Sequence, residues 1–189
     1  MRFELGSDSM KSFSKWFSAL AALVLLAGPA VAGDAIAAGR VKGIHADKKE
    51  FVLTDSAYGK DWTFKLGDTV IINRGGKESQ SGLNAGDPVN VCYDKGPLTR
   101  TAHYILVQEG GAKNRWLMHG TVKNYDADKK ELTFTSQASN WTFPMGDVKV
   151  RLNREDSKIG HIKIGDKALA IVEKIGEITT LECLMIERK

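Results

Sequence analysis

Apolar and polar residues alternate with a period of two along much of the chain, a pattern typical of half-buried β-strands. In residues 50–54 the apolar positions are Phe51 and Leu53, and Val70 and Ile72 follow the same period. Such runs are short. Many of them are separated by glycine, asparagine or aspartate, which are common in turns. The pattern therefore predicts short strands joined by tight turns.

The strand pattern occurs twice, because the chain contains an internal repeat. Residues 39–54 read GRVKGIHADKKEFVLT, and residues 120–135 read GTVKNYDADKKELTFT. A repeat of this length predicts two tandem modules. The offset stays between 79 and 81 residues in the later matches, which pair Trp62 with Trp141, Gly67 with Gly146, Asn73 with Asn153, and Gly86 with Gly165.

Each copy offers about six short strands at the spacing of an all-β barrel or sandwich. We therefore expect an all-β chain of two small tandem β-barrels. Module 1 covers residues 39–109, residues 110–118 connect the modules, and module 2 covers residues 119–189. A module of about 70 residues buries only about 60% of its unfolded surface. The two modules are therefore expected to pack against each other.

The N-terminal region differs from the rest. Residues 16–27 read WFSALAALVLLA, with Lys11 and Lys15 before them and Ala30-Val31-Ala32 after them. These are the three parts of a secretory signal peptide. The apolar run reaches about 18 Å as a helix, well short of the roughly 30 Å hydrocarbon core of a bilayer.

Residues 1–32 are therefore predicted to be a cleaved signal peptide, with residues 1–9 as a possible misplaced start. Cleavage after Ala37 is the alternative to cleavage after Ala32. The protein is expected to be exported, periplasmic or extracellular, and to have no stable membrane anchor after cleavage.

Composition and charge exclude some classes of protein and of binding partner. The chain has 189 residues, 42% of them hydrophobic, which excludes wholesale disorder. Its 27 lysines and arginines are interspersed with 23 aspartates and glutamates, giving a net charge of +4 and no basic stripe. We expect no nucleic-acid partner. Two cysteines, Cys92 and Cys183, stand at non-equivalent positions of the repeat, so two separately packed thiols are favoured over a disulfide between the modules.

No known catalytic pattern occurs. The chain lacks G-x-S-x-G, H-E-x-x-H and a phosphate-binding loop. We therefore expect a non-enzymatic protein without catalytic residues or a cofactor.

Tryptophans are the candidate ligand-binding residues. Trp62 and Trp141 invite a stacking role, because aromatic side chains on small barrels stack bases or sugars. Each shares a strand face with Phe64 or Phe143, so a place in the core is the favoured interpretation. Trp116, in the connector, is the more exposed candidate.

Three features together suggest a family. They are G-x-V-K-G-I-x-x-x-x-K from Gly39, a middle strand rich in Trp and Phe, and G-D-x-V-x-V from Gly86. This combination resembles exported bacterial barrel domains of unknown function with an OB-like fold of five to six strands. More distantly, it resembles CusF-like copper-binding domains. The copper resemblance implies a site of one His, two Met and a Trp on adjoining strands, for which Met145 is the weak candidate near a Trp.

The expected function is that of an exported, non-enzymatic binding or structural module of the bacterial cell envelope, with an envelope or extracellular protein as a possible partner. Copper handling in the periplasm is one alternative. Binding of an oligonucleotide or a glycan is the other.

Overall fold

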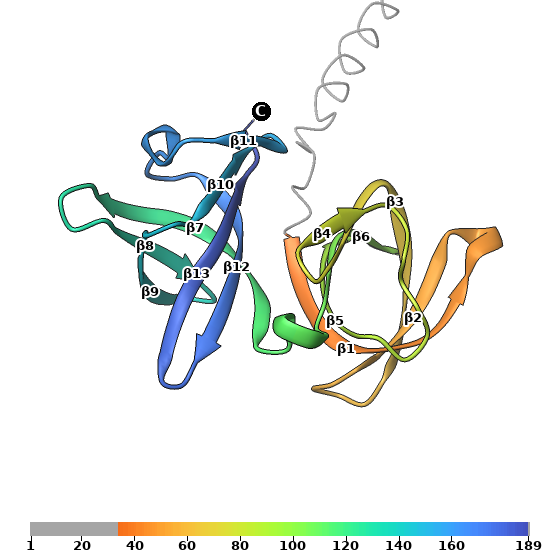
Figure 1. Cartoon of the computed structure of the whole chain (residues 1–189). Coiled ribbons are helices and arrows are strands. Elements are labelled where there is room, and N and C mark those ends of the chain that lie inside the picture. Colours follow the sequence, from red (N-terminus) through yellow and green to blue (C-terminus); the bar gives the residue numbers. More distant parts are fainter. Residues whose placement is uncertain (1–33, 189) are drawn as a thin grey trace, which may run out of the picture. The chain divides into compact units, whose positions relative to one another are not determined.

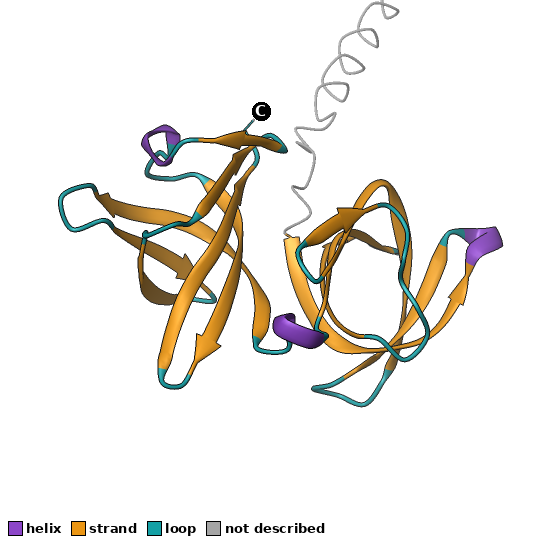
Figure 2. Ribbon diagram, in the orientation of Figure 1, coloured by secondary structure: helices purple, strands orange, loops and turns teal. Residues whose placement is uncertain are grey.

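The computed structural model describes residues 34–188, which form the expected β-strands. The predicted signal peptide lies outside these residues. No helix within them is long and apolar enough to cross a bilayer. The prediction of an all-β fold is confirmed, since short 3-10 turns are the helical elements of this part of the chain (Figure 2). These turns are η1 (Ala46–Lys48), η2 (Gly110–Ala112) and η3 (Ile159–His161).

The first sheet closes into a five-stranded barrel (Figure 1). Its strands pair in the order β2-β1-β5-β6-β3, and β2 also pairs with β3, which completes the ring. The short β4 adds to β3 outside this ring. The bounds are β1 (Asp34–His45), β2 (Glu50–Asp55), β3 (Asp61–Arg74), β4 (Lys77–Ser79), β5 (Pro88–Lys95) and β6 (Arg100–Val107).

The second sheet has the same succession of pairings but stays open. Its order is β11-β10-β13-β12-β7-β8-β9, with no ladder between β9 and β13 among the described strands. The bounds are β7 (Arg115–Asp126), β8 (Glu131–Ser136), β9 (Ser139–Pro144), β10 (Lys149–Leu152), β11 (Glu155–Ser157), β12 (Lys167–Ile175) and β13 (Ile178–Ile186).

Pro144 explains part of this difference. In the first sheet Leu66 donates its N–H to the carbonyl of Lys49 on the β2 side, at 2.8 Å, so the N–H of Lys65 points the other way, toward β6. Pro144 occupies the position of Lys65 in the repeat and has no N–H to donate toward β13.

The strands begin earlier than the predicted modules. β1 starts at Asp34, and Ala35 and Ala37 pair with Tyr93 and Val91 of β5. β7 starts at Arg115, so the apolar end of the predicted connector belongs to the first strand of the second sheet. The module boundaries of the sequence analysis stay predictions.

Each sheet encloses its own core, built from the apolar positions that the period of two predicted. Phe51, Leu53 and Phe64 are fully buried in the first sheet. Leu132 and Phe134 are their counterparts in the second sheet and are equally buried.

A third apolar cluster joins the two sheets, which belong to one compact unit. Its buried members are Cys92, Tyr104, Leu106, Leu117, Ile171 and Cys183. At its edge Glu78 forms an ion pair with Arg151 and accepts a hydrogen bond from the Tyr104 hydroxyl, 3.0 Å away. The expected packing of one module on the other is therefore present in the structure.

Candidate ligand site

Trp62 is half-buried in the first barrel and has three neighbours around its ring. The Arg100 guanidinium lies over the indole, 4.6 Å from the ring centroid. Tyr58 stacks on Trp62 at 6.3 Å, and Tyr93 meets it edge-on at 6.5 Å. This half-buried indole therefore belongs to an aromatic cluster of the first barrel, and the Arg100 guanidinium covers part of its surface.

Trp141, the counterpart of Trp62, is more open. Its side chain is 38% exposed, whereas Phe143 is buried. The expected core position is therefore correct for the phenylalanine and wrong for this tryptophan. The physical reason is that Thr179 stands where the first module has Arg100, so the second module lacks the guanidinium that covers the indole.

Met145, the weak metal candidate, is a core residue. It is 1% exposed and packs in the second apolar core. Its thioether is a packing group and faces no described cluster of metal-ligating side chains.

The expectation that Trp116 is the more exposed tryptophan is wrong, because Trp116 is half-buried whereas Trp141 is exposed. Trp116 nevertheless lines a cleft of about 400 Å³. It pairs with Val172 across β7 and β12, and one part of the indole packs against the second core. In the first sheet the corresponding pair is Ala35 with Tyr93, so each barrel end combines one small and one large side chain. The lining residues of the cleft are Gln108, Lys113, Asn114, Arg115, Trp116, Lys174 and Gly176.

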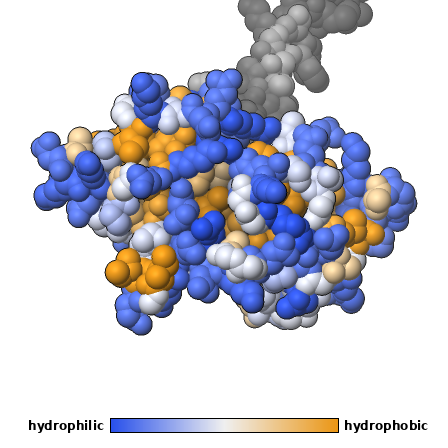
Figure 3. Space-filling model, viewed as in Figure 1, coloured by the Kyte–Doolittle hydropathy of each residue, from blue (hydrophilic) through white to orange (hydrophobic). Residues whose placement is uncertain are grey.

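Backbone pairing fixes the shape of this cleft. The Lys174 N–H donates to the Asn114 carbonyl at 3.0 Å, which ties the end of β12 to the chain just before β7. The Gln108 amide donates to the Arg115 carbonyl at 2.6 Å, which holds the other wall. The turn of the β12–β13 hairpin borders the cleft through Gly176 and carries an apolar patch, where Ile175 and Ile178 are more than 60% exposed (Figure 3).

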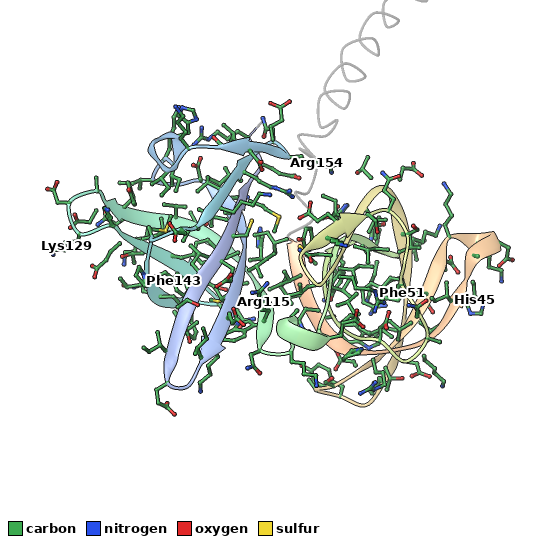
Figure 4. The ribbon with its side chains drawn as sticks, in the orientation of Figure 1. His45, Phe51, Arg115, Lys129, Phe143 and Arg154 are labelled. Carbon is green, nitrogen blue, oxygen red and sulfur yellow. The ribbon has the colours of Figure 1, made fainter. Side chains whose placement is uncertain are left out.

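The cleft is cationic. Its lining holds Lys113, Arg115 and Lys174 and no carboxylate. Arg115, near the start of β7 (Figure 4), is compensated by Glu173 at 3.1 Å and Glu182 at 3.5 Å. Within residues 34–188 no carboxylate lies within ion-pair distance of Lys113 or Lys174. Two ammonium groups are thus available to an anion beside Trp116.

Sequence reasoning singled out Trp116 but missed the other residues of the cleft. Lys174 and Gly176 lie about sixty residues further along the chain and arrive only through the pairing of β12 with β7. No local pattern around Lys113 or Gln108 distinguishes them from other polar surface residues.

Both cysteines are buried thiols. Burial is the largest influence on Cys183 and raises its pKa to about 11. We expect neither thiol of the folded protein to react with an aromatic disulfide reagent at pH 8, because both side chains are buried from the reagent and, at Cys183, the reactive thiolate is also disfavoured. The same assay in denaturant without reductant should count two thiols, and a count of zero there would show that a bridge forms.

The closed barrel and its open counterpart define a small all-β barrel protein. Similar solved structures include three of CusF from Escherichia coli: a variant with Cu(II) at 18% identity, the Ag(I) form at 19% and the apo form at 18%. Their TM-scores are 0.33, 0.32 and 0.32. The matches cover 41%, 41% and 42% of this chain and 94%, 98% and 94% of the respective CusF chains. No protein-family model matches the sequence, and no curated protein does.

Proposed function

We propose that this chain is an exported, non-enzymatic binding module of the bacterial cell envelope. Its ligand is anionic and contains a ring, and the cleft at Trp116 holds it without converting it. The single observation that carries this proposal is the lining of that cleft, in which Trp116 lies beside the ammonium groups of Lys113 and Lys174, and Arg115 is paired with two glutamates outside the lining. Ligand sites combine an apolar surface with a few placed polar groups in this way.

The test is calorimetric titration of the mature chain, residues 33–189, with digalacturonate. A Trp116→Ala variant is expected to bind at least about 5-fold more weakly, because stacking on an aromatic side chain is worth about 1–3 kcal/mol. Trp141→Ala is the matched control and should bind like the wild type. Loss of binding in the control with retention in Trp116→Ala would place the ligand elsewhere.

Charge provides a second readout of the same site. Lys113→Gln and Lys174→Gln should each weaken digalacturonate binding and reduce its dependence on salt, because exposed charges are screened. Cellobiose, which is a neutral disaccharide, should bind much more weakly than digalacturonate. Equal affinity for the two disaccharides would contradict an anionic ligand.

The copper alternative does not fit the residues present. An internal cation, the Arg100 guanidinium, lies over the Trp62 indole, and Met145 is enclosed in the core. Residues 34–188 hold no group of three or more His, Cys, Asp or Glu side chains placed to bind a metal ion. Soft Cu(I) prefers thioether or thiolate ligands, and the Met145 thioether is used in core packing, so we prefer the cleft at Trp116 over a copper site.

Export makes a prediction about the mature N-terminus. Residues 35–37 pair with β5, and Ala37 is buried, so cleavage after Ala37 would remove part of a barrel strand. Cleavage after Ala32 leaves β1 whole. N-terminal sequencing of the protein recovered from outside the cytoplasm should therefore begin at Gly33, and a start at Ala38 would contradict this account.

A further inference from the structure

A second hollow adjoins the cleft at Trp116. It measures about 220 Å³ and lies between the two sheets, with Asn73 and Glu78 on one side and Lys149 and Arg151 on the other. Arg115 lines both this hollow and the cleft. The two spaces are therefore neighbours that share one side chain.

The charges in this hollow are partly committed to one another. Glu78 binds Arg151 and the Tyr104 hydroxyl, and Glu182 lies 3.5 Å from Arg115. Lys149 is different, because its partner Asp156, which lies 3.5 Å away, is 75% exposed to water. A pair of this kind contributes little in water, so the Lys149 ammonium can exchange it for a ligand carboxylate.

We infer that the two hollows are subsites of one groove, which passes Arg115 and holds consecutive units of an acidic polysaccharide. This inference rests on the proposed function. One sugar ring lies on Trp116 with its carboxylate near Lys113 or Lys174, and a later carboxylate reaches Lys149. The exposed Asn114 amide in the first subsite suits a sugar hydroxyl group. The Asn73 amide in the second is already bonded to the Tyr104 hydroxyl and the Gly76 N–H.

The carboxylates of the second hollow favour a polysaccharide over a nucleic acid. A nucleic acid carries a phosphate at every residue and depends on dense cationic contacts. Glu78 and Glu182 would lie against such a backbone. A polyuronate presents hydroxyl groups between its carboxylates, and these can accept or donate hydrogen bonds beside the two glutamates.

The experiment is a length series of oligogalacturonates, from dimer to octamer, titrated into the mature chain. A hexamer can place a dimer unit in the site in about five registers. Its affinity should therefore exceed that of the dimer by about five-fold for statistical reasons alone. A continuous groove predicts that the hexamer binds more tightly than the dimer by about 30-fold or more. Lys149→Gln should remove the excess for the hexamer and leave dimer binding unchanged. Lys129→Gln, on the exposed turn after β7, is the control and should change neither (Figure 4).

The outcomes separate the two proposals. Dimer binding that needs Trp116, with only a statistical gain for the hexamer, overturns the groove and leaves the proposed function standing. Failure of every uronate to bind overturns both. Tighter binding of oligo(dT) than of the octamer, with a steep salt dependence, also overturns the groove, because the ligand would then be a nucleic acid.

Discussion

A Gly120→Ala variant is expected to lose about 3 kcal/mol or more of its unfolding free energy, or to fail to fold. A Cβ atom at Gly120 would lie 2.1 Å from the Thr135 carbonyl oxygen and 2.9 Å from the Phe134 ring. Moving either neighbour would cost free energy, because one is backbone of the paired strand β8 and the other is a fully buried core side chain. Urea unfolding followed by circular dichroism measures the loss.

The repeat supplies matched controls for this prediction. Gly39 is the counterpart of Gly120, and a Cβ there would lie 2.2 Å from the Thr54 carbonyl oxygen. At Gly43, further along the same strand, an added Cβ would meet no atom within 4 Å. Gly39→Ala should therefore be strongly destabilised, while Gly43→Ala unfolds near the wild-type midpoint. Equal midpoints for the two variants would refute the close strand contact.

Asp166→Ala is expected to cost about 2–3 kcal/mol of unfolding free energy, since hydrogen bonds to a charged group are worth more than neutral ones. The carboxylate is nearly buried and accepts the Lys163 N–H at 2.7 Å. It also accepts two bonds from the Arg188 guanidinium, at 2.8 and 2.5 Å. Asp128→Ala, on an exposed turn, is the control and should be neutral.

This prediction has a pH dependence whose sign is fixed. The hydrogen bonds from Arg188 are the largest influence on Asp166 and lower the pKa of its carboxyl below the usual value. The stabilisation is therefore complete above the unfolded pKa, near 3.9, and disappears as the pH falls through the lower folded pKa. The difference between wild type and Asp166→Ala should be constant from pH 5 to 8 and shrink below about pH 4. A difference that does not shrink at all as the pH falls below 4 would assign the effect to packing.

The core was predictable because it depends on local alternation. Phe51, Leu53 and Phe64 could be assigned to one strand face from their spacing alone, and the structure buries all three. Gly86-Asp87 and Gly165-Asp166 could likewise be assigned to the turns before β5 and β12. Their arginine partners could not, because Arg74 binds Asp87 in one barrel while Arg188 binds Asp166 in the other. These guanidinium groups come from non-equivalent positions of the repeat.

The candidate site was less predictable for a similar reason. Period two assigns Trp62 and Trp141 to the same environment, yet Arg100 covers one indole and Thr179 leaves the other open. The difference lies on a strand that is distant in sequence. The cleft at Trp116 depends on the contact between the end of β12 and the start of β7, which no single segment of the sequence specifies.

The central claim is that the cleft beside Trp116 is the ligand site. Backbone amide chemical shifts of the isotope-labelled mature chain, recorded during titration with digalacturonate, test it most directly. The account predicts saturable shifts that concentrate on residues 113–116 and 174–176, with little change around Trp62 or Trp141. Shifts that concentrate at either of those two tryptophans, or no saturable shifts at all, would contradict it.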